Sequence, residues 1–131
     1  MNAMSAVLVI DDNRDIREAI QSALEDEGYA TEGAANGREG LDRLQAMARP
    51  CLILLDLMMP VMTGIEFLEA LNAEPAFAGI PVVIVSAYDR LAQTAGATGF
   101  LPKPIDLHDL THTVSRYCTA RTAPSPDASA G

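Results

Sequence analysis

Short runs of apolar residues recur along the chain, and longer segments of mixed character separate them. Continuous apolar runs of this length are typical of β-strands that helices cover on both faces. Five runs are candidates, and the second is more polar than the others, which suits a strand at the edge of a sheet. The five are Val7–Ile10, Tyr29–Ala34, Leu52–Leu55, Val82–Val85 and Phe100–Leu101.

The segments between these runs have the spacing of amphipathic helices. In the first, apolar residues recur at i, i+3, i+4, i+7 and i+8, so they share one face of a helix. They are Ile16, Ala19, Ile20, Ala23 and Leu24. Asn13 is suited to cap the start of this helix, and Gly28 to end it with a left-handed residue.

Three more helices follow the same pattern. One begins after Asn36, one spans about Gly64–Asn72, and the last spans about Asp106–Tyr117 with Asp106 as its cap. The residues expected to face the sheet are, in chain order, Leu41, Leu44, Met47, Ile65, Leu68, Leu71, Leu107, Leu110 and Val114.

Strands that alternate with helices predict right-handed crossovers and a parallel sheet with helices on both faces, an α/β fold. The 131 residues suffice for one domain with a sizeable core. We place this domain at residues 6–118, after an N-terminal extension at residues 1–5. Residues 119–131 have few large apolar side chains, so we expect a disordered tail with no output domain after it.

The charge of the chain narrows the classes of partner. Its 18 acidic and 9 basic residues give a formal net charge of -9, which disfavours direct binding to nucleic acids or to anionic membranes. No apolar run approaches the roughly 20 residues of a transmembrane helix. The N-terminus also lacks the basic and apolar regions of a signal peptide.

The two cysteines, Cys51 and Cys118, lie far apart in the sequence and lack the spacing of metal ligands. We therefore expect two reduced thiols in a cytoplasmic protein.

Charged and polar residues follow the predicted strands at the ends where such sheets bind ligands. They are Asp11, Asp12, Asp56, Ser86 and Lys103. Three carboxylates at one edge repel one another unless a cation lies between them. A hard ion with oxygen ligands, Mg²⁺, fits best because no histidine or thiolate is near.

Such a site is suited to phosphoryl transfer, which depends mainly on positioning and on neutralisation of charge. One carboxylate acts as the nucleophile, while Mg²⁺ and the Lys103 ammonium supply positive charge. The Ser86 hydroxyl can donate a hydrogen bond to a phosphoryl oxygen.

Four motifs together resemble the receiver domain of response regulators, the CheY-like superfamily of two-component signalling. They are VLVIDDNRDIR, LILLDLMMPVMTG, PVVIVSAY and GFLPKPI, which occur in the family's order between about Val7 and Tyr117. The resemblance implies a (βα)5 flavodoxin-like three-layer sandwich with strand order 2-1-3-4-5. It also implies a phosphorelay switch of the single-domain type rather than a turnover enzyme, although the domain assists its own phosphorylation and dephosphorylation.

The resemblance assigns a metal site and a phosphoacceptor. Asp56 would accept the phosphoryl group from a histidine kinase or a histidine phosphotransfer protein, and would also bind Mg²⁺, which Mn²⁺ can replace. Asp12 would bind the ion directly and Asp11 largely through water. Met58 would contribute its backbone carbonyl.

The remaining roles concern the phosphoryl group and the switch. Ser86 would bond the phosphoryl oxygen, Lys103 would contact Asp56 or its phosphate, and Phe100 would move inward when Ser86 shifts. The pocket would also include Ala87, Tyr88 and Pro104, with a cis peptide bond after Lys103.

The chain departs from the family between Ser86 and Lys103, where it is shorter by about one helical turn. The segment AYDRLAQTAGATG contains two glycines and two threonines, which are poor helix formers. We therefore expect a short and mobile fourth helix.

Several alternatives remain open. Asp11 and Asp12 could be a solvated helix entry, and Phe100 a plain core aromatic. His108 and His112 have i, i+4 spacing, but without a third ligand a solvated face is expected.

Three other functions compete with a stand-alone receiver. A phosphatase of the haloacid-dehalogenase type also uses an Asp at a strand end, but requires a second Asp where this chain has Met58. A degenerate receiver would act as an adaptor without phosphorylation, and a receiver cut from a hybrid histidine kinase would share all these motifs.

Overall fold

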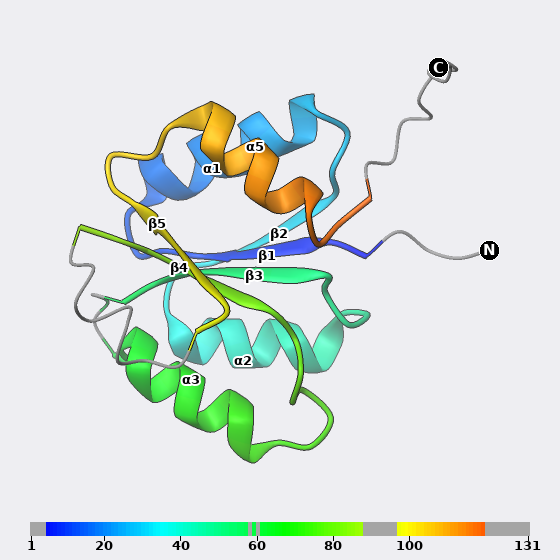
Figure 1. Cartoon of the computed structure of the whole chain (residues 1–131). Coiled ribbons are helices and arrows are strands. Elements are labelled where there is room, and N and C mark those ends of the chain that lie inside the picture. The colour runs from blue at the N-terminus through cyan, green and yellow to red at the C-terminus, as the bar shows by residue number, and fades with distance from the viewer. Residues whose placement is uncertain (1–4, 58, 60, 88–96, 120–131) are drawn as a thin grey trace.

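The computed structural model of the chain describes residues 5–57, 59, 61–87 and 97–119 (Figure 1). A parallel sheet of five strands forms its centre, in the order β2-β1-β3-β4-β5. The strands are β1 (Val7–Ile10), β2 (Thr31–Ala34), β3 (Leu52–Asp56), β4 (Val82–Ser86) and β5 (Gly99–Pro102). The predicted strand order is confirmed, with the more polar β2 at one edge.

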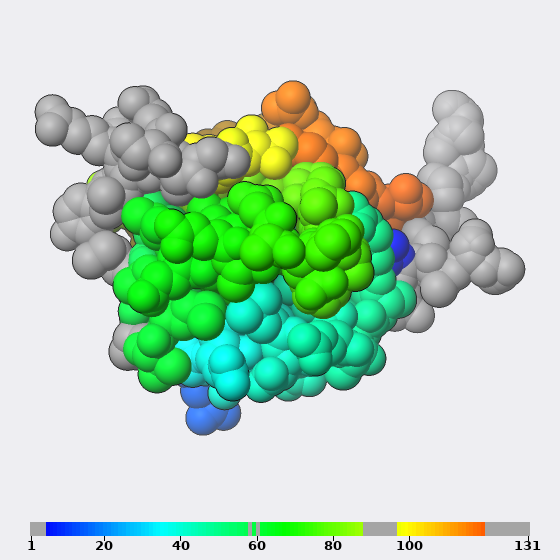
Figure 2. All heavy atoms as spheres, turned by 90° about the horizontal axis from the view of Figure 1, so that it is seen from below, coloured from blue at the N-terminus to red at the C-terminus, as the bar shows by residue number. Residues whose placement is uncertain are grey.

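Helices cover both faces of the sheet, so the molecule has three layers. On one face lie α1 (Arg14–Asp26) and α5 (Leu107–Ser115), and on the other lie α2 (Gly37–Ala46) and α3 (Gly64–Ala73) (Figure 1). Figure 2 looks onto the second face, where α2 and α3 lie side by side. This arrangement confirms the predicted flavodoxin-like sandwich.

The strand β3 contributes to the core on both faces of the sheet. Ile53 and Leu55 pack in the cluster under α2 and α3, whereas Leu52 and Leu54 pack in the cluster under α1 and α5. All four side chains have an exposed fraction of 1% or less. Burial on both faces fixes the strand, and with it the residue that ends it, Asp56.

The helix ends form as the sequence predicts. The side chains of Asn13, Asn36 and Asp106 each accept a hydrogen bond from the backbone N–H three residues later. Gly28 follows α1 with a φ of 93°, which is the left-handed conformation expected of it. Thr63, whose capping role was missed from the sequence, caps α3 through a capping box.

Three residues that we expected in the buried helix faces are exposed, so the prediction was wrong for each. The exposed fraction is 38% for Ile65 and 57% for Leu107, and Ala19 also falls in the exposed class. Ile65 and Leu107 belong to the first turns of α3 and α5, and Phe67 takes the expected inward place of Ile65. Ala19 and Leu107 instead line a surface groove between α1 and the segment after β5.

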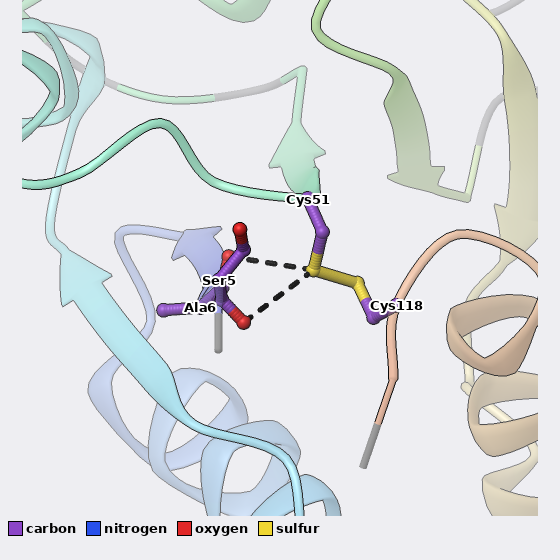
Figure 3. The surroundings of a disulfide bond; sticks show 4 residues. All are labelled: Ser5, Ala6, Cys51 and Cys118. Carbon is purple, nitrogen blue, oxygen red and sulfur yellow. Dashed lines mark hydrogen bonds between the residues drawn. A yellow bond between two sulfur atoms is a disulfide. The ribbon is translucent and has the colours of Figure 1, made fainter. Parts of the chain in front are cut away.

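The two cysteines form a disulfide bond, which corrects the expectation of two reduced thiols (Figure 3). Cys51 immediately precedes β3, and Cys118 follows α5. Their Cα atoms are 5.4 Å apart although 67 positions separate them in the sequence. The return of α5 across the sheet brings the two residues together.

Some predictions fall on residues outside those described. They are the short fourth helix, the pocket residue Tyr88, the backbone carbonyl of Met58, and nearly all of the N-terminal extension and the tail. Among the described residues, no helix is long and apolar enough to cross a membrane.

Candidate functional site

The carboxyl ends of four strands meet at one edge of the sheet and bring the predicted site residues together. Asp11 and Asp12 follow β1, Asp56 ends β3, Ser86 ends β4 and Lys103 follows β5. The strands are parallel and in register, with Asp56 opposite Val85 and Ser86 opposite Pro102. The edge also lies where strand order changes direction, between β1 and β3.

Three carboxylates converge at this edge. Asp11, Asp12 and Asp56 each offer an oxygen, and these oxygens all lie within 4.8 Å of one another. Asp11 and Asp56 are buried, with exposed fractions of 2% and 5%, whereas Asp12 is exposed. Carboxylates held this close repel one another. An all-oxygen donor set open to water on one side fits a hard divalent cation such as Mg²⁺.

A single ammonium group bridges two of the carboxylates. Lys103 Nζ lies 3.2 Å from Asp11 Oδ2 and 3.5 Å from Asp56 Oδ1. Its side chain is only 21% exposed, so solvent screens these pairs less than it would at the surface. The backbone N–H of Lys103 donates to Ser86 O at 3.0 Å, which fixes the residue beside β4. The peptide bond between Lys103 and Pro104 is cis, as the resemblance implies.

The loop between β1 and α1 holds Asp11 from several sides. Its Oδ1 accepts a hydrogen bond from the Asn13 backbone N–H at 2.9 Å, while its Oδ2 faces Lys103. Arg17 Nη1 donates to the backbone oxygen of Asp11 at 2.8 Å. This role of Arg17 was missed from the sequence, where the only signal is a basic residue on the half-buried face of α1.

The loop between β3 and α3 has two unusual positions. Val61 has a φ of 70° and an exposed fraction of 80%, and this left-handed conformation is unfavourable for a β-branched residue. Gly64, the first residue of α3, packs directly on the backbone after Asp56. A Cβ on Gly64 would lie 2.7 Å from Leu57 Cα and 2.8 Å from Asp56 O.

The predicted switch residues lie on the two strands at this end of the sheet. Ser86 is buried, with an exposed fraction of 1%, while Ala87 after it is exposed. Phe100 is half-buried and packs against the cluster under α2 and α3. Phe100 is also in register with Ile84, two residues before Ser86.

An apolar groove lies beside the site on the α1 and α5 face. Its volume is about 230 Å³. The lining residues are Ile16, Ala19, Ile20, Lys103, Pro104, Ile105 and Leu107. Lys103 thus belongs to both the groove and the carboxylate site.

The comparison with protein families decides to which family this fold belongs. Residues 7–115 match the response regulator receiver domain family. The chain belongs to that family. The receiver domain of two-component response regulators therefore accounts for the cluster of three Asp residues, and the phosphatase alternative is set aside.

Relatives and solved structures agree with this assignment. The response regulator MprA of Mycolicibacterium vanbaalenii is 35% identical over 95% of this chain and 54% of its own length. The response regulator Rre1 of a Synechocystis strain is 36% identical over 94% of this chain and 55% of its own length. This chain thus spans about half the length of the curated relatives it matches.

Among solved structures, the chemotaxis protein CheY4 of Vibrio cholerae has a TM-score of 0.79 and 37% identity. The match covers 88% of this chain and 99% of that protein. A receiver protein from Pseudomonas putida has a TM-score of 0.81 and 30% identity, with the same coverage.

The two histidines of α5 lie outside this site. The rings of His108 and His112 stack with their centroids 6.5 Å apart. The cluster of possible metal ligands found among the described residues consists of Asp11, Asp12 and Asp56, without either histidine.

Proposed function

We propose that this receiver domain accepts a phosphoryl group on Asp56 from a histidine kinase or a histidine phosphotransfer protein. The observation that carries the proposal is the convergence of three carboxylates and one ammonium group at the end of a strand buried on both faces. A nucleophile held on a rigid strand is better positioned than one on a loop.

In the transfer, an Asp56 carboxylate oxygen forms a bond to phosphorus while the bond from phosphorus to the donor's imidazole nitrogen breaks. Bound Mg²⁺, for which Mn²⁺ can substitute, would neutralise negative charge on the phosphoryl oxygens. Asp11, Asp12 and Asp56 would hold it, together with the backbone carbonyl of Met58.

The chain's own groups position the acceptor. Lys103 Nζ already lies 3.5 Å from Asp56 Oδ1. It is therefore close enough to pair with a negatively charged oxygen of the phosphoryl group once Asp56 carries one. The Asn13 N–H and Arg17 keep Asp11 in place against the repulsion of its neighbours. The buried Ser86 hydroxyl would donate to a phosphoryl oxygen.

We propose further that phosphorylation acts as a switch rather than as a step of a turnover cycle. The phosphoryl group adds about two negative charges at the rim. Ser86 and the segment after it are drawn toward that charge, and Phe100, two register positions away on β5, follows inward. A protein partner would read the altered surface.

Incubation with Mg²⁺ and acetyl phosphate, followed by intact mass measurement, tests the acceptor. The wild type should gain one phosphoryl group, and chelation of Mg²⁺ should abolish the gain. Asp56→Asn should stay unlabelled, whereas the matched control Asp42→Asn, an exposed carboxylate on α2, should label like the wild type.

Equal labelling of the wild type and of Asp56→Asn would contradict the role of Asp56. No labelling of the wild type with acetyl phosphate or with a phosphorylated histidine phosphotransfer protein would favour the degenerate adaptor. The stand-alone regulator and the hybrid-kinase domain share this chemistry, so both contexts predict the same labelling.

A further inference from the structure

The disulfide bond lies at the opposite end of β3 from the phosphoacceptor. Cys51 immediately precedes the strand and Asp56 ends it. Cys118 follows the last turn of α5, so the bond joins the end of that helix to the start of the central strand (Figure 3). The carboxylate site and its chemistry do not involve this pair.

The surroundings of Cys51 suit a thiol as well as a disulfide. Its Sγ lies 3.7 Å from Ser5 O and 3.6 Å from Ala6 O (Figure 3). A disulfide sulfur has no proton to donate, so these contacts become hydrogen bonds only when Cys51 is reduced. Both oxidation states of Cys51 therefore find a suitable environment in the folded protein.

The two cysteines are anchored differently. The backbone N–H of Cys51 donates to Ala6 O at 3.1 Å, which holds it beside the start of β1 whatever its oxidation state. Cys118 lies after α5, and its N–H donates to Val114 O in the last turn of that helix at 2.9 Å. Cys118 is held against the core by apolar burial, with an exposed fraction of 9%, and by the disulfide, which links residues 117–118 to the start of β3.

We propose that Cys51 and Cys118 form a reversible redox site that fastens the C-terminal end of α5 to the sheet. A dithiol reductant opens the bond in two steps. Its first thiolate attacks the sulfur of Cys51, the less buried of the two residues, and releases the Cys118 thiolate, which takes up a proton. Its second thiol then displaces Cys51, so two electrons pass to the protein and the reductant becomes a disulfide.

Opening the bond has a local consequence. The turn that contains Tyr117 and Cys118 loses its covalent tie to β3, whereas Cys51 keeps its backbone hydrogen bond and gains a thiol donor to Ala6 O or Ser5 O. The oxidation state of the two cysteines therefore determines how tightly the residues that follow α5 are held against β3. The proposal is independent of phosphorylation of Asp56.

Two measurements on the full chain test this site. The protein is equilibrated with a series of ratios of reduced to oxidised glutathione, and free thiols are alkylated and counted by mass. The disulfide fraction should follow the ratio in both directions while the far-ultraviolet circular dichroism stays constant. Amide hydrogen exchange is then compared between the oxidised and reduced wild type.

In the reduced protein, exchange should rise by at least about tenfold at Tyr117 and Cys118. The amide of Ile53, which donates to Pro81 O in the same end of the sheet, should not change. Cys118→Ser should show the reduced pattern at every glutathione ratio. Because the reduced wild type is measured directly, poor folding of the variant would not weaken the test.

Three results would overturn the proposal. Complete alkylation of both cysteines in oxidising buffer would show that the bond does not form. A bond that opens only together with unfolding would show a permanent cross-link. Unchanged amide hydrogen exchange at Tyr117 and Cys118 after reduction would show that the bond does not restrain these residues.

Discussion

Gly64 offers a test of how closely α3 packs on the backbone that carries Asp56. In Gly64→Ala the new Cβ would lie 2.7 Å from Leu57 Cα and 2.8 Å from Asp56 O. The Leu57 side chain, whose Cδ2 would also lie 2.7 Å away, can turn aside, but these two backbone atoms cannot. An ordinary contact distance of 3.4 Å requires the start of α3 or residues 56–57 to move by about 0.7 Å.

Two effects of opposite sign compete in this variant. Helix propensity alone would stabilise the alanine variant by up to about 1 kcal/mol. Overpacking of this kind costs about 1–3 kcal/mol, and the clash with backbone places the cost in the upper part of that range. We therefore expect a net loss of about 1–2 kcal/mol in the free energy of unfolding. A displacement of Asp56 by up to about 0.7 Å should also slow phosphorylation, by up to about 100-fold.

Urea denaturation and a time course of labelling by acetyl phosphate measure the two effects. Gly99→Ala is the matched control, because its Cβ would make an ordinary 3.5 Å contact with Val83 Cγ2, and it should keep wild-type stability and labelling. A Gly64→Ala protein that is as stable as the wild type and is labelled at the same rate would refute this reasoning.

Four further predictions concern stability. Thr63→Ala removes the side-chain acceptor at the start of α3 and should lower the free energy of unfolding by about 1 kcal/mol in urea; an unchanged midpoint would contradict its capping role. Loss of the disulfide in Cys118→Ser opens a loop of 67 positions and should cost about 4 kcal/mol, and the reduced wild type should show a similar loss. Val61→Asn relieves the left-handed φ of 70° and should gain about 1 kcal/mol, whereas Val61→Thr, still β-branched, should gain nothing. Burial raises the pKa of the Tyr29 phenol, so its contribution to stability is complete below about pH 10 and is lost as pH rises further; Tyr29→Phe should therefore resist alkaline unfolding, and equal alkaline midpoints would speak against this cause.

The sequence was sufficient to predict the elements that periodicity and capping define. The strands, the caps and the convergence of Asp11, Asp56 and Lys103 all follow from where apolar runs stop, because parallel strands present their carboxyl ends at one edge. The exposed positions of Ile65 and Leu107 could not be read in this way. Periodicity identifies one face of a helix but not how far its first turn extends beyond the sheet.

The disulfide and the Arg17 contact were missed for a different reason. Sequence separation says nothing of the distance between Cys51 and Cys118 until the path of α5 back across the sheet is known. Arg17 binds a backbone oxygen, and an acceptor that every residue possesses leaves no signal in the pattern of side chains.

Side chains of β3 pack alternately on the two faces of the sheet, and this has a consequence for how the sequence of the domain can vary. Leu52 and Leu54 belong to the layer with α1 and α5, and Ile53 and Leu55 to the layer with α2 and α3. Compensating substitutions should therefore arise mainly within one layer, since side chains of the two layers are separated by the sheet. One layer could be exchanged for that of a related receiver to alter partner choice, while the other layer keeps Asp56 in register with its neighbours.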